Sequence, residues 1–564
     1  MSMEDHPKKI IFLLFLAAVT LNVVSITSWN FSYIANDGIQ YLSTAGNWLA
    51  GNGFSTNTLT YAPHFQGKFP AAQTVWPNGY PFAIALLIKS GMDAPVAVLT
   101  LNHAAHALAS LVMWLLLQKM GITRLFASVC TLVFYSTSMP WAYVSGGMTE
   151  PVFTTLLLAA LLFLPRPGHS TLPAWLLCGL IIAACIYVRF STVFFAASTG
   201  AGIMLYLLMV ERRKPSALIK PCFMLALLVS LPALAFGHLM YRTHTLIGTF
   251  DRYQGERVPE SLVSTLRQWP VAASEMLGFS ASSLISSELT TALFVIFVLL
   301  ATVIVLWFLM TRAGFSVGAS ADKSVIHFRV TGLVASLHAL LMMVYLSYAS
   351  MTSSPLEIIS RYTYQVYPGL FAVFCVMFHT LLTRYASRNT PSFAPAHTAL
   401  KTVAASLVAL YLFAQINSSV VTRTHYFFFA KATDGLMAQQ VSENIALESF
   451  IKGCFENNSQ LKSIWSTHGQ PVHLHTGIPT LTHLDIYTRR AFSANELADR
   501  MSEYNVGMFI FIEPLNFYDT QYSNYMSSVK EWITGEGFVK LRMLDNSFAK
   551  TGTVDIYAPP ECSA

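Results

Sequence analysis

Residues 10–28 read IIFLLFLAAVTLNVVSITS, an apolar run of 19 residues that contains no charged side chain. A helix needs about 20 such residues to cross the ~30 Å hydrocarbon core of a bilayer. Several runs of similar length follow along the chain, and short segments between them carry most of the charge. This pattern predicts a polytopic α-helical membrane protein.

The composition favours the same class of protein. Of 564 residues, 54% are hydrophobic and 11% are charged, and the mean hydropathy is +0.51. A water-soluble protein of this size would lack the polar surface to cover itself. The net charge of +6 comes largely from basic residues in the loops between apolar runs, where membrane topology accounts for them. Nucleic acid is therefore not an expected partner.

The apolar runs predict about eleven membrane spans. Their centres are expected near Phe15, Leu108, Val133, Leu157, Ile181, Gly200, Leu227, Val298, Leu340, Val373 and Val408. The first run follows Lys8 and Lys9, as the apolar part of a signal peptide does, but no small-residue cleavage site comes after it. We expect a retained first helix.

Basic residues recur in alternate loops, which the positive-inside rule assigns to the cytoplasm. The loops 29–92, 241–288 and 350–364, and everything after about residue 417, are then expected outside the cytoplasm. The expected location is the bacterial inner membrane, and the endoplasmic reticulum is the alternative.

The composition changes after the last span and predicts two domains. Residues 1–418 form a transmembrane domain that includes the first outer loop, and residues 419–564 form a C-terminal extracytoplasmic α/β domain. Within the second domain, helices are expected over 434–450 and 495–503, and strands over 471–475, 506–512, 538–544 and 554–557. Of seven cysteines, only Cys454 and Cys562 lie outside apolar runs, and whether they pair is left open.

Acidic side chains stand at the outer ends of two predicted spans. Asp37, in N-D-G-I-Q-Y-L, begins a surface helix that Gly51 and Gly53 end, and Glu150, in S-G-G-M-T-E-P, begins the fourth span. A carboxylate in such a place can take a proton from a hydroxyl, or orient a substrate or a cation. Helix capping for Asp37 and helix-start electrostatics for Glu150 are the alternative roles.

Two arginines are predicted on the same side of the membrane as these acids. Arg189, in Y-V-R-F-S, ends the fifth span, and Arg361, in I-S-R-Y-T-Y-Q-V-Y-P, precedes the tenth. A guanidinium in such a place either binds a phosphate through two hydrogen bonds or extends to the lipid head groups. We take both arginines, with the adjacent Tyr362, as candidate substrate-binding residues.

Aromatic and histidine side chains complete the set of candidates. The motif V-W-P-N-G-Y-P places Trp76 and Tyr80 at the membrane interface before a short helix over 82–88, as substrate contacts or as interface anchors. His103 and His106 lie one turn apart on the second span and are expected to line a polar seam between helices. A metal site there would need a third ligand, which the sequence does not identify.

In the order of these motifs, the chain resembles the GT-C superfamily of integral-membrane glycosyltransferases, particularly the protein O-mannosyltransferase and aminoarabinose-transferase-like group. The resemblance covers about three quarters of the chain. It implies transfer of a hexosyl or pentosyl group from a polyprenyl-phosphate carrier, which is a membrane lipid, to a protein, lipid or glycan acceptor. The transfer usually inverts the configuration at the anomeric carbon. Some members use a divalent cation, but Asn36 replaces the second acid common in the first loop, so metal dependence stays open.

The hypothesis is that Asp37 acts as general base, Arg189 and Arg361 hold the carrier phosphate, and Glu150 orients the acceptor, the donor or a cation. No nucleotide-binding glycine loop is present, and an activated carrier linkage does not require one. A transporter or lipid flippase, or a non-catalytic scaffold, would share this hydropathy. The clustering of ionisable residues at outer helix ends favours chemistry at the interface over transport.

Overall fold

The structure is a computed structural model. It describes residues 34, 36–60, 64–137, 143–144, 146–167, 169–210, 218–243, 261–276, 323–351, 360–387, 448–466, 472–473, 476–482, 494–514, 520–545 and 552–563. The spans predicted around Phe15, Val298 and Val408 lie outside these residues, as does most of the predicted helix 434–450.

The chain divides into two compact units. Unit 1 comprises Met1–Tyr33, Val98–Arg242 and Val258–Arg423, and unit 2 comprises Ile34–Ala97, Thr243–Arg257 and Thr424–Ala564. The division groups most of the first outer loop with the C-terminal segment, whereas the sequence assigned that loop to the transmembrane domain. The domain boundary at residue 418 stays a prediction.

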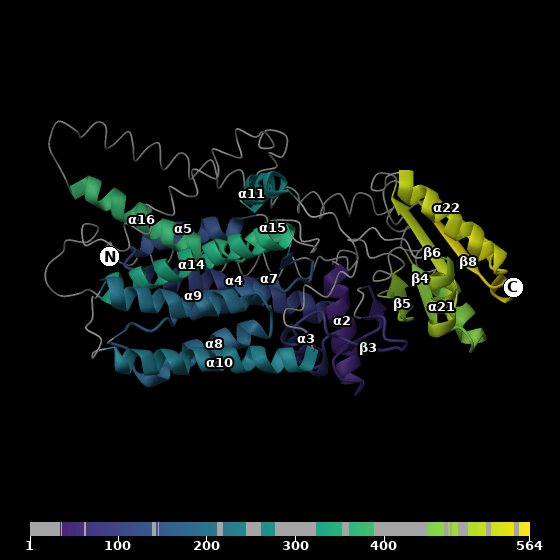
Figure 1. Ribbon diagram of the computed structural model, residues 1–564, viewed down its shortest axis with the longest axis horizontal. Helices are drawn as coiled ribbons and strands as arrows, with labels where there is room; N and C mark the ends of the chain where they lie inside the picture. The colour runs from purple at the N-terminus through teal and green to yellow at the C-terminus, as the bar shows by residue number, and fades with distance from the viewer. Residues whose placement is uncertain are drawn as a thin grey trace, which may run out of the picture. The chain divides into compact units, whose positions relative to one another are not determined.

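Unit 1 contains the long apolar helices (Figure 1). Its elements are α4 (Ala94–Lys119), α5 (Arg124–Ser136), α7 (Glu150–Leu162), α8 (Leu172–Ile186), α9 (Thr192–Leu205) with the π-helical turn η3 (Tyr206–Val210), α10 (Ile219–Thr243), α11 (Leu262–Met276), α14 (Lys323–Met351), α15 (Ser360–Thr363) and α16 (Tyr367–Ser387). Eight predicted span centres, Leu108, Val133, Leu157, Ile181, Gly200, Leu227, Leu340 and Val373, fall inside these helices. Within the described residues, four segments are long and apolar enough to cross a bilayer: Ala94–Lys119, Thr192–Met209, Ile219–Thr243 and Lys323–Met351.

The helices of unit 1 expose large apolar side chains that water would not favour. On α10, Ile219 is 74% exposed and Leu234 is 70% exposed, and Leu180 on α8 is 58% exposed. Hydrocarbon is the solvent that suits such faces, because lipid tails are as apolar as leucine. The chain is a multi-pass membrane protein.

Small residues and hydroxyls join these helices. A Cβ atom added to Gly202 of α9 would lie 2.8 Å from Val334 Cγ2 of α14, so the two helices approach closely only because this position is glycine. The Thr155 hydroxyl of α7 donates to the Ala105 carbonyl of α4 at 2.6 Å. A glycine at a close helix contact and a hydroxyl that hydrogen-bonds to a neighbouring helix are both typical of helix packing within a membrane.

The interval predicted as the outer loop 241–288 is partly helical. Helix α10 continues to Thr243, and α11 packs against α14, with Trp269 Nε1 donating to Ser347 Oγ at 3.1 Å. Helix α11 is too short and too polar for its sequence to be recognised as a membrane span. Its packing against α14 explains why the segment is helical.

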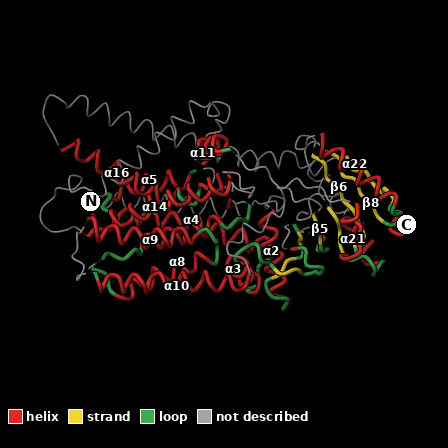
Figure 2. The backbone as a smooth tube through the Cα atoms, viewed as in Figure 1, coloured by secondary structure: helices red, strands yellow, loops and turns green. Residues whose placement is uncertain are grey.

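All of the described strands belong to unit 2 (Figure 2). Its helices are α2 (Asn36–Leu49), α3 (Gly79–Lys89), a helix over 448–457, α21 (Ala494–Tyr504) and α22 (Thr520–Gly535), and a 3₁₀ turn, η9 (Pro560–Ser563), follows the last strand. Its strands are β1 (Ser55–Thr56), β2 (Thr58–Leu59), β3 (Ala71–Ala72), β4 (Ser463–Ser466), β5 (Thr480–Thr482), β6 (Val506–Pro514), β7 (Val539–Asp545) and β8 (Gly552–Ala558).

Six of these strands form one sheet in the order β2-β5-β4-β6-β8-β7. The first four run parallel, and β8 is antiparallel to both β6 and β7. Strand β6 is buried on both faces, because Met508 and Ile510 face one core while Phe509 and Phe511 face the other.

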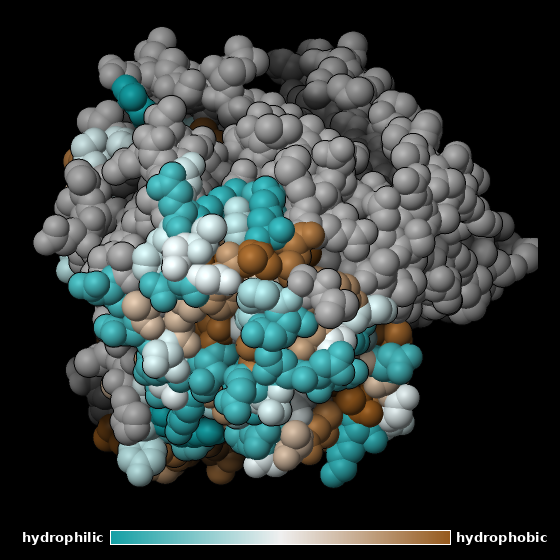
Figure 3. Space-filling view, turned by 90° about the vertical axis from the view of Figure 1, so that its right-hand side faces the viewer, coloured by the Kyte–Doolittle hydropathy of each residue, from teal (hydrophilic) through white to brown (hydrophobic). Residues whose placement is uncertain are grey.

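The surface in Figure 3, the side of the molecule at the right of Figure 1, is largely hydrophilic where it is described.

Elements are found at most of the positions predicted for the C-terminal segment. The expected strands 506–512, 538–544 and 554–557 correspond to β6, β7 and β8, and the expected helix 495–503 to α21. The strand expected over 471–475 is wrong, because Val472 and His473 are helical and the Val472 carbonyl accepts the Thr476 hydroxyl at 2.7 Å. That local bond favours a turn over an extended strand.

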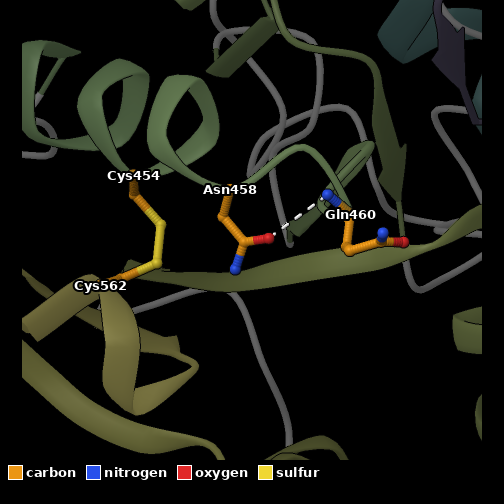
Figure 4. Close-up of a disulfide and its surroundings, with 4 residues drawn as sticks. All are labelled: Cys454, Asn458, Gln460 and Cys562. Carbon is orange, nitrogen blue, oxygen red and sulfur yellow. Dashed lines mark hydrogen bonds between the residues drawn. A yellow bond between two sulfur atoms is a disulfide. The ribbon is translucent and has the colours of Figure 1, made fainter.

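Cys454 and Cys562 form a disulfide with a Cα–Cα distance of 5.1 Å (Figure 4). The bond ties the helix over 448–457 to η9, which follows the last strand. Near it, the Gln460 backbone N–H donates to Asn458 Oδ1 at 3.3 Å and shapes the turn that leads into β4.

Candidate active site

Glu150 binds two arginines from distant parts of unit 1. Arg189 Nη1 lies 2.6 Å from Glu150 Oε1, and Arg361 Nε lies 2.5 Å from the same oxygen. The Glu150 side chain is fully buried, and the two arginine side chains are 10% and 16% exposed. The structure thus brings together three of the residues that the sequence singled out.

The start of α7 fixes the position of the carboxylate. Glu150 lies in the first turn, where the helix dipole favours an acid, and Pro151 is tolerated there because that position needs no N–H partner. The preceding segment is held by Asn102 of α4, whose Nδ2 donates to the Met148 carbonyl at 2.9 Å. Thr149 also contributes, since its hydroxyl accepts from Arg189 Nη1 at 3.1 Å.

The two arginines lie in short turns rather than in helix interiors. Arg189 is in the connection between α8 and α9, where Thr192 donates from its hydroxyl to the Arg189 carbonyl at 2.7 Å. Arg361 is in the single-turn helix α15. A second contact joins these two turns, because the Ser191 hydroxyl donates to Oε1 of Gln365, which is 1% exposed. The two arginines are therefore held in a defined relation to each other.

Two guanidiniums face one carboxylate in this group, so positive charge exceeds negative charge among these three side chains. Glu150 Oε2 is buried and accepts no hydrogen bond from any side chain that the structure describes. An anion with a hydroxyl nearby suits such a site: the guanidiniums attract the anion, and the second carboxylate oxygen can accept a hydrogen bond.

The same group does not suit a divalent cation. Both arginines would repel it, and the described residues include no cluster of three His, Cys, Asp or Glu side chains that could hold a metal ion. The role of Glu150 in orienting a cation, one of three that the sequence left open, is disfavoured by these two positive neighbours and stays a prediction.

Asp37 belongs to unit 2. It lies in the first turn of α2 and is partly exposed. The predicted end of the helix is confirmed, because Gly51 and Gly53 follow it with φ of +84° and +67°, which favour glycine. The assignment of Asp37 as general base stays a prediction.

The predicted aromatic residues of the first loop pack around Tyr41. The Tyr41 ring centroid lies 5.8 Å from that of Trp76 and 5.0 Å from that of Tyr80. Tyr80 is fully buried, and Trp76 Nε1 donates to Gln40 Oε1 at 3.0 Å. The helix after this motif begins at Gly79 rather than at Phe82, because Pro81 fits the first turn of a helix. Substrate contact by Trp76 or Tyr80 stays a prediction.

The other candidates lie within the helical packing of unit 1. His103 and His106 are buried on α4, as expected for a polar seam, and the His106 ring stacks on Tyr135 with centroids 4.7 Å apart. Tyr362 packs beside the apolar cluster of Trp269, Met342 and Leu346. Thr149, Ser191 and Gln365 were not predicted, although each lies within four residues of a predicted site residue.

The fold is shared with ArnT from Cupriavidus metallidurans. The apo structure matches with a TM-score of 0.54 and 12% identity over 98% of each chain. The structure of ArnT bound to undecaprenyl phosphate matches with a TM-score of 0.55 and 12% identity, over 98% of this chain and 99% of ArnT. The fold that the sequence resemblance implied is therefore confirmed, and it is the fold of ArnT.

A weaker likeness is to the archaeal oligosaccharyltransferase AglB from Archaeoglobus fulgidus. Its TM-score is 0.49 at 9% identity, over 88% of this chain and 69% of AglB. No protein-family model matches the sequence, and no curated protein matches it either.

Proposed function

We propose that the protein is a glycosyltransferase that moves a sugar from a polyprenyl-phosphate carrier to an acceptor on the extracytoplasmic side of the membrane. The observation that carries the proposal is the pair Arg189 and Arg361 held on the buried Glu150. Two guanidiniums at the ends of apolar helices are suited to a phosphate whose lipid tail stays in the hydrocarbon. ArnT, which shares the fold, has been solved with undecaprenyl phosphate bound.

Each residue has a distinct role in this proposal. Arg189 and Arg361 bind the carrier phosphate and stabilise the charge that develops as it leaves. Glu150 positions both guanidiniums through Oε1, and its Oε2 accepts a hydrogen bond from a hydroxyl of the donor sugar or the acceptor. Asp37 acts as general base on the acceptor hydroxyl.

The bonds balance without a further reactant. The acceptor oxygen forms a bond to the anomeric carbon while the bond from that carbon to the phosphate oxygen breaks. The electron pair leaves with the polyprenyl phosphate, and the acceptor proton goes to the Asp37 carboxylate. Direct displacement in this way inverts the anomeric carbon, so the configuration of the product reports on the mechanism.

The disulfide supports an extracytoplasmic position for the C-terminal segment. Disulfides persist in oxidising compartments and are rare in the cytosol, where thiols are kept reduced. Cys454–Cys562 lies in the part of the chain that the positive-inside rule places outside. We propose that the transferred sugar is a hexose or a pentose.

The test is transfer of labelled sugar from a panel of polyprenyl-phosphate sugars by purified protein in lipid, with native membrane extract supplying acceptors. The wild type is expected to label an acceptor. Asp37→Asn is expected to lose transfer while it still binds the donor, and Arg361→Gln to lose donor binding. Near-normal transfer by Asp37→Asn would refute its assignment as base.

A transporter or lipid flippase is the alternative that the same experiment separates. It would bind the lipid-linked sugar and exchange it across vesicles without a covalent product, whatever the extract. A scaffold would bind no donor at all. The position of the charged group at the helix ends, rather than in helix interiors, favours the transferase.

A further inference from the structure

The first outer loop and the C-terminal segment share one sheet. Strand β2 pairs in parallel with β5, so that Thr58 lies opposite Thr480 and Leu59 opposite Leu481. Leu59 is fully buried in the same core as Trp465 of β4. The loop thus supplies an edge strand and a core residue to a sheet that the C-terminal segment otherwise builds alone.

Residues 65–69 of the loop make further contacts with α21. The Gly67 N–H donates to the Tyr504 hydroxyl at 2.7 Å, and the Phe69 ring centroid lies 5.4 Å from that of Tyr504. The Arg500 guanidinium lies 4.0 Å from the centre of the Phe65 ring, a cation–π contact. We refer to residues 58–60 and 65–69 together as the loop clamp.

The loop clamp is also bonded to the helix that carries Asp37. Gln40 follows Asp37 by about one turn of α2 and is fully buried. Its Nε2 donates to Thr60 Oγ1 at 3.0 Å. Ser43 lies three positions after Gln40 on the same helix, and its hydroxyl accepts a hydrogen bond from the Asn57 backbone N–H at 2.9 Å. A continuous path of buried contacts therefore runs from the C-terminal sheet through β2 to α2.

We propose that the C-terminal domain positions Asp37 through the loop clamp, with Gln40, Thr60 and Tyr504 as positioning residues. The inference rests on the proposed role of Asp37 as general base. An independent acceptor-binding module would need none of these bonds to α2. A catalytic group must be held within about 0.5 Å of its productive geometry, which a surface helix achieves only with buried support.

Two isosteric substitutions break the clamp at different points. Thr60→Val removes the hydroxyl that accepts from Gln40 Nε2, and Tyr504→Phe removes the hydroxyl that accepts from the Gly67 N–H. Each is expected to lower kcat roughly ten- to hundredfold, because misplacement of a base by an ångström has effects of that size. The acceptor KM and the affinity for polyprenyl phosphate are expected to stay within about threefold of wild type, because neither substitution touches the arginine site.

Matched controls separate this role from general stability. Thr60→Ser keeps the hydroxyl and is expected to restore kcat. Tyr557→Phe removes a hydroxyl from the same apolar core, on β8 rather than beside the loop, and is expected to leave kcat unchanged. A rise in acceptor KM alone in Thr60→Val and Tyr504→Phe would overturn the proposal in favour of a recognition module, and so would unchanged kinetics in both.

A cysteine pair tests the clamp without reference to activity. Thr58→Cys with Thr480→Cys places two thiols at paired positions of β2 and β5, and oxidant should cross-link them in native membranes. A locked protein that retains transfer supports the proposal, whereas absence of the cross-link overturns it. If the wild type binds no polyprenyl phosphate while the cross-link forms, the proposed function fails and the physical clamp stands.

Discussion

Arg361 Nε lies 2.5 Å from Oε1 of Glu150, although 211 positions separate the two residues in the chain. The contact joins the short helix α15 to the start of α7. Because the same oxygen also accepts from Arg189, the carboxylate is the point on which both guanidiniums are oriented. We therefore treat Glu150 as a positioning residue for the arginines.

Glu150→Gln should destabilise the protein as well as impair donor binding. The substitution keeps the size of the side chain but removes the carboxylate that both largely buried guanidiniums contact, and breaking a buried ion pair in this way costs about 3–5 kcal/mol. The midpoint of thermal unfolding in detergent is expected to fall. The matched control is Glu448→Gln, whose partner Lys452 is 42% exposed and whose loss should cost less than about 0.5 kcal/mol. Equal effects in the two variants would contradict a structural role for the buried group.

Ser191→Ala should weaken donor binding although the serine needs no contact with the donor. Its hydroxyl donates to Gln365, so the substitution leaves a buried acceptor unsatisfied and loosens the turn that carries Arg361, at a cost of about 1–2 kcal/mol. Affinity for a polyprenyl phosphate, measured by equilibrium binding in nanodiscs, is expected to fall roughly five- to thirtyfold, which corresponds to the same free energy.

The control for that variant is Ser230→Ala, in which an exposed hydroxyl bonds only to the Leu227 carbonyl of its own helix. It should bind the donor as the wild type does. If Ser191→Ala also binds normally, the contact between the two turns does not position Arg361.

The membrane part could be predicted from the sequence because a span depends on local composition. A run such as 94–119 is apolar whatever its neighbours do, and the predicted centre at Leu108 falls within α4. The order of Asp37, Glu150, Arg189 and Arg361 likewise indicated the GT-C fold. The signal for a span lies within one short stretch, whereas the likeness to that fold depends on the order of motifs spread over residues 37–361.

Contacts between distant segments were beyond prediction for a physical reason. Strand β2 has two residues, too few to show an alternating pattern, and it is a strand only because β5 pairs with it. The Ser191–Gln365 contact joins two common polar residues without any motif. The helical turn at Val472 was predicted as a strand because apolar alternation over five residues also fits other structures.

Loss of the disulfide should destabilise the C-terminal part of unit 2 strongly. Cys454 and Cys562 are 108 positions apart, and closing a loop of that length restricts the unfolded chain by about 4–5 kcal/mol in the entropic model. Cys454→Ser should become sensitive to limited proteolysis at a lower temperature than the wild type. Cys222→Ser, which removes a free thiol on α10, is the control and should behave as the wild type does.

Reductant provides the complementary measurement. Dithiothreitol should bring the wild type to the protease sensitivity of Cys454→Ser and leave that variant unchanged. A wild type that resists reductant while the variant is sensitive would show that the serine substitution acts through packing and not through the covalent bond.

Asp555 should make the C-terminal domain less stable in acid. Burial alone would raise the pKa of this carboxyl, but a hydrogen bond from Lys530 at 2.7 Å and the positive charges of Lys530 and of Lys540, which lies 2.8 Å away, outweigh burial and hold the pKa below its usual range. A carboxyl whose pKa is lower in the folded than in the unfolded state contributes stability that is complete above the unfolded value, about 3.9, and is lost as the pH falls through the folded value.

Asp555→Asn should therefore cost about 1 kcal/mol at pH 7, a figure reduced for the exposure of Lys540, and should flatten the stability profile below about pH 4. Asp499→Asn, on the exposed face of α21, is the matched control and should keep the wild-type profile. The measurement is protease sensitivity of the domain as a function of pH, and an unchanged acid dependence in Asp555→Asn would assign the acid response to other carboxyls.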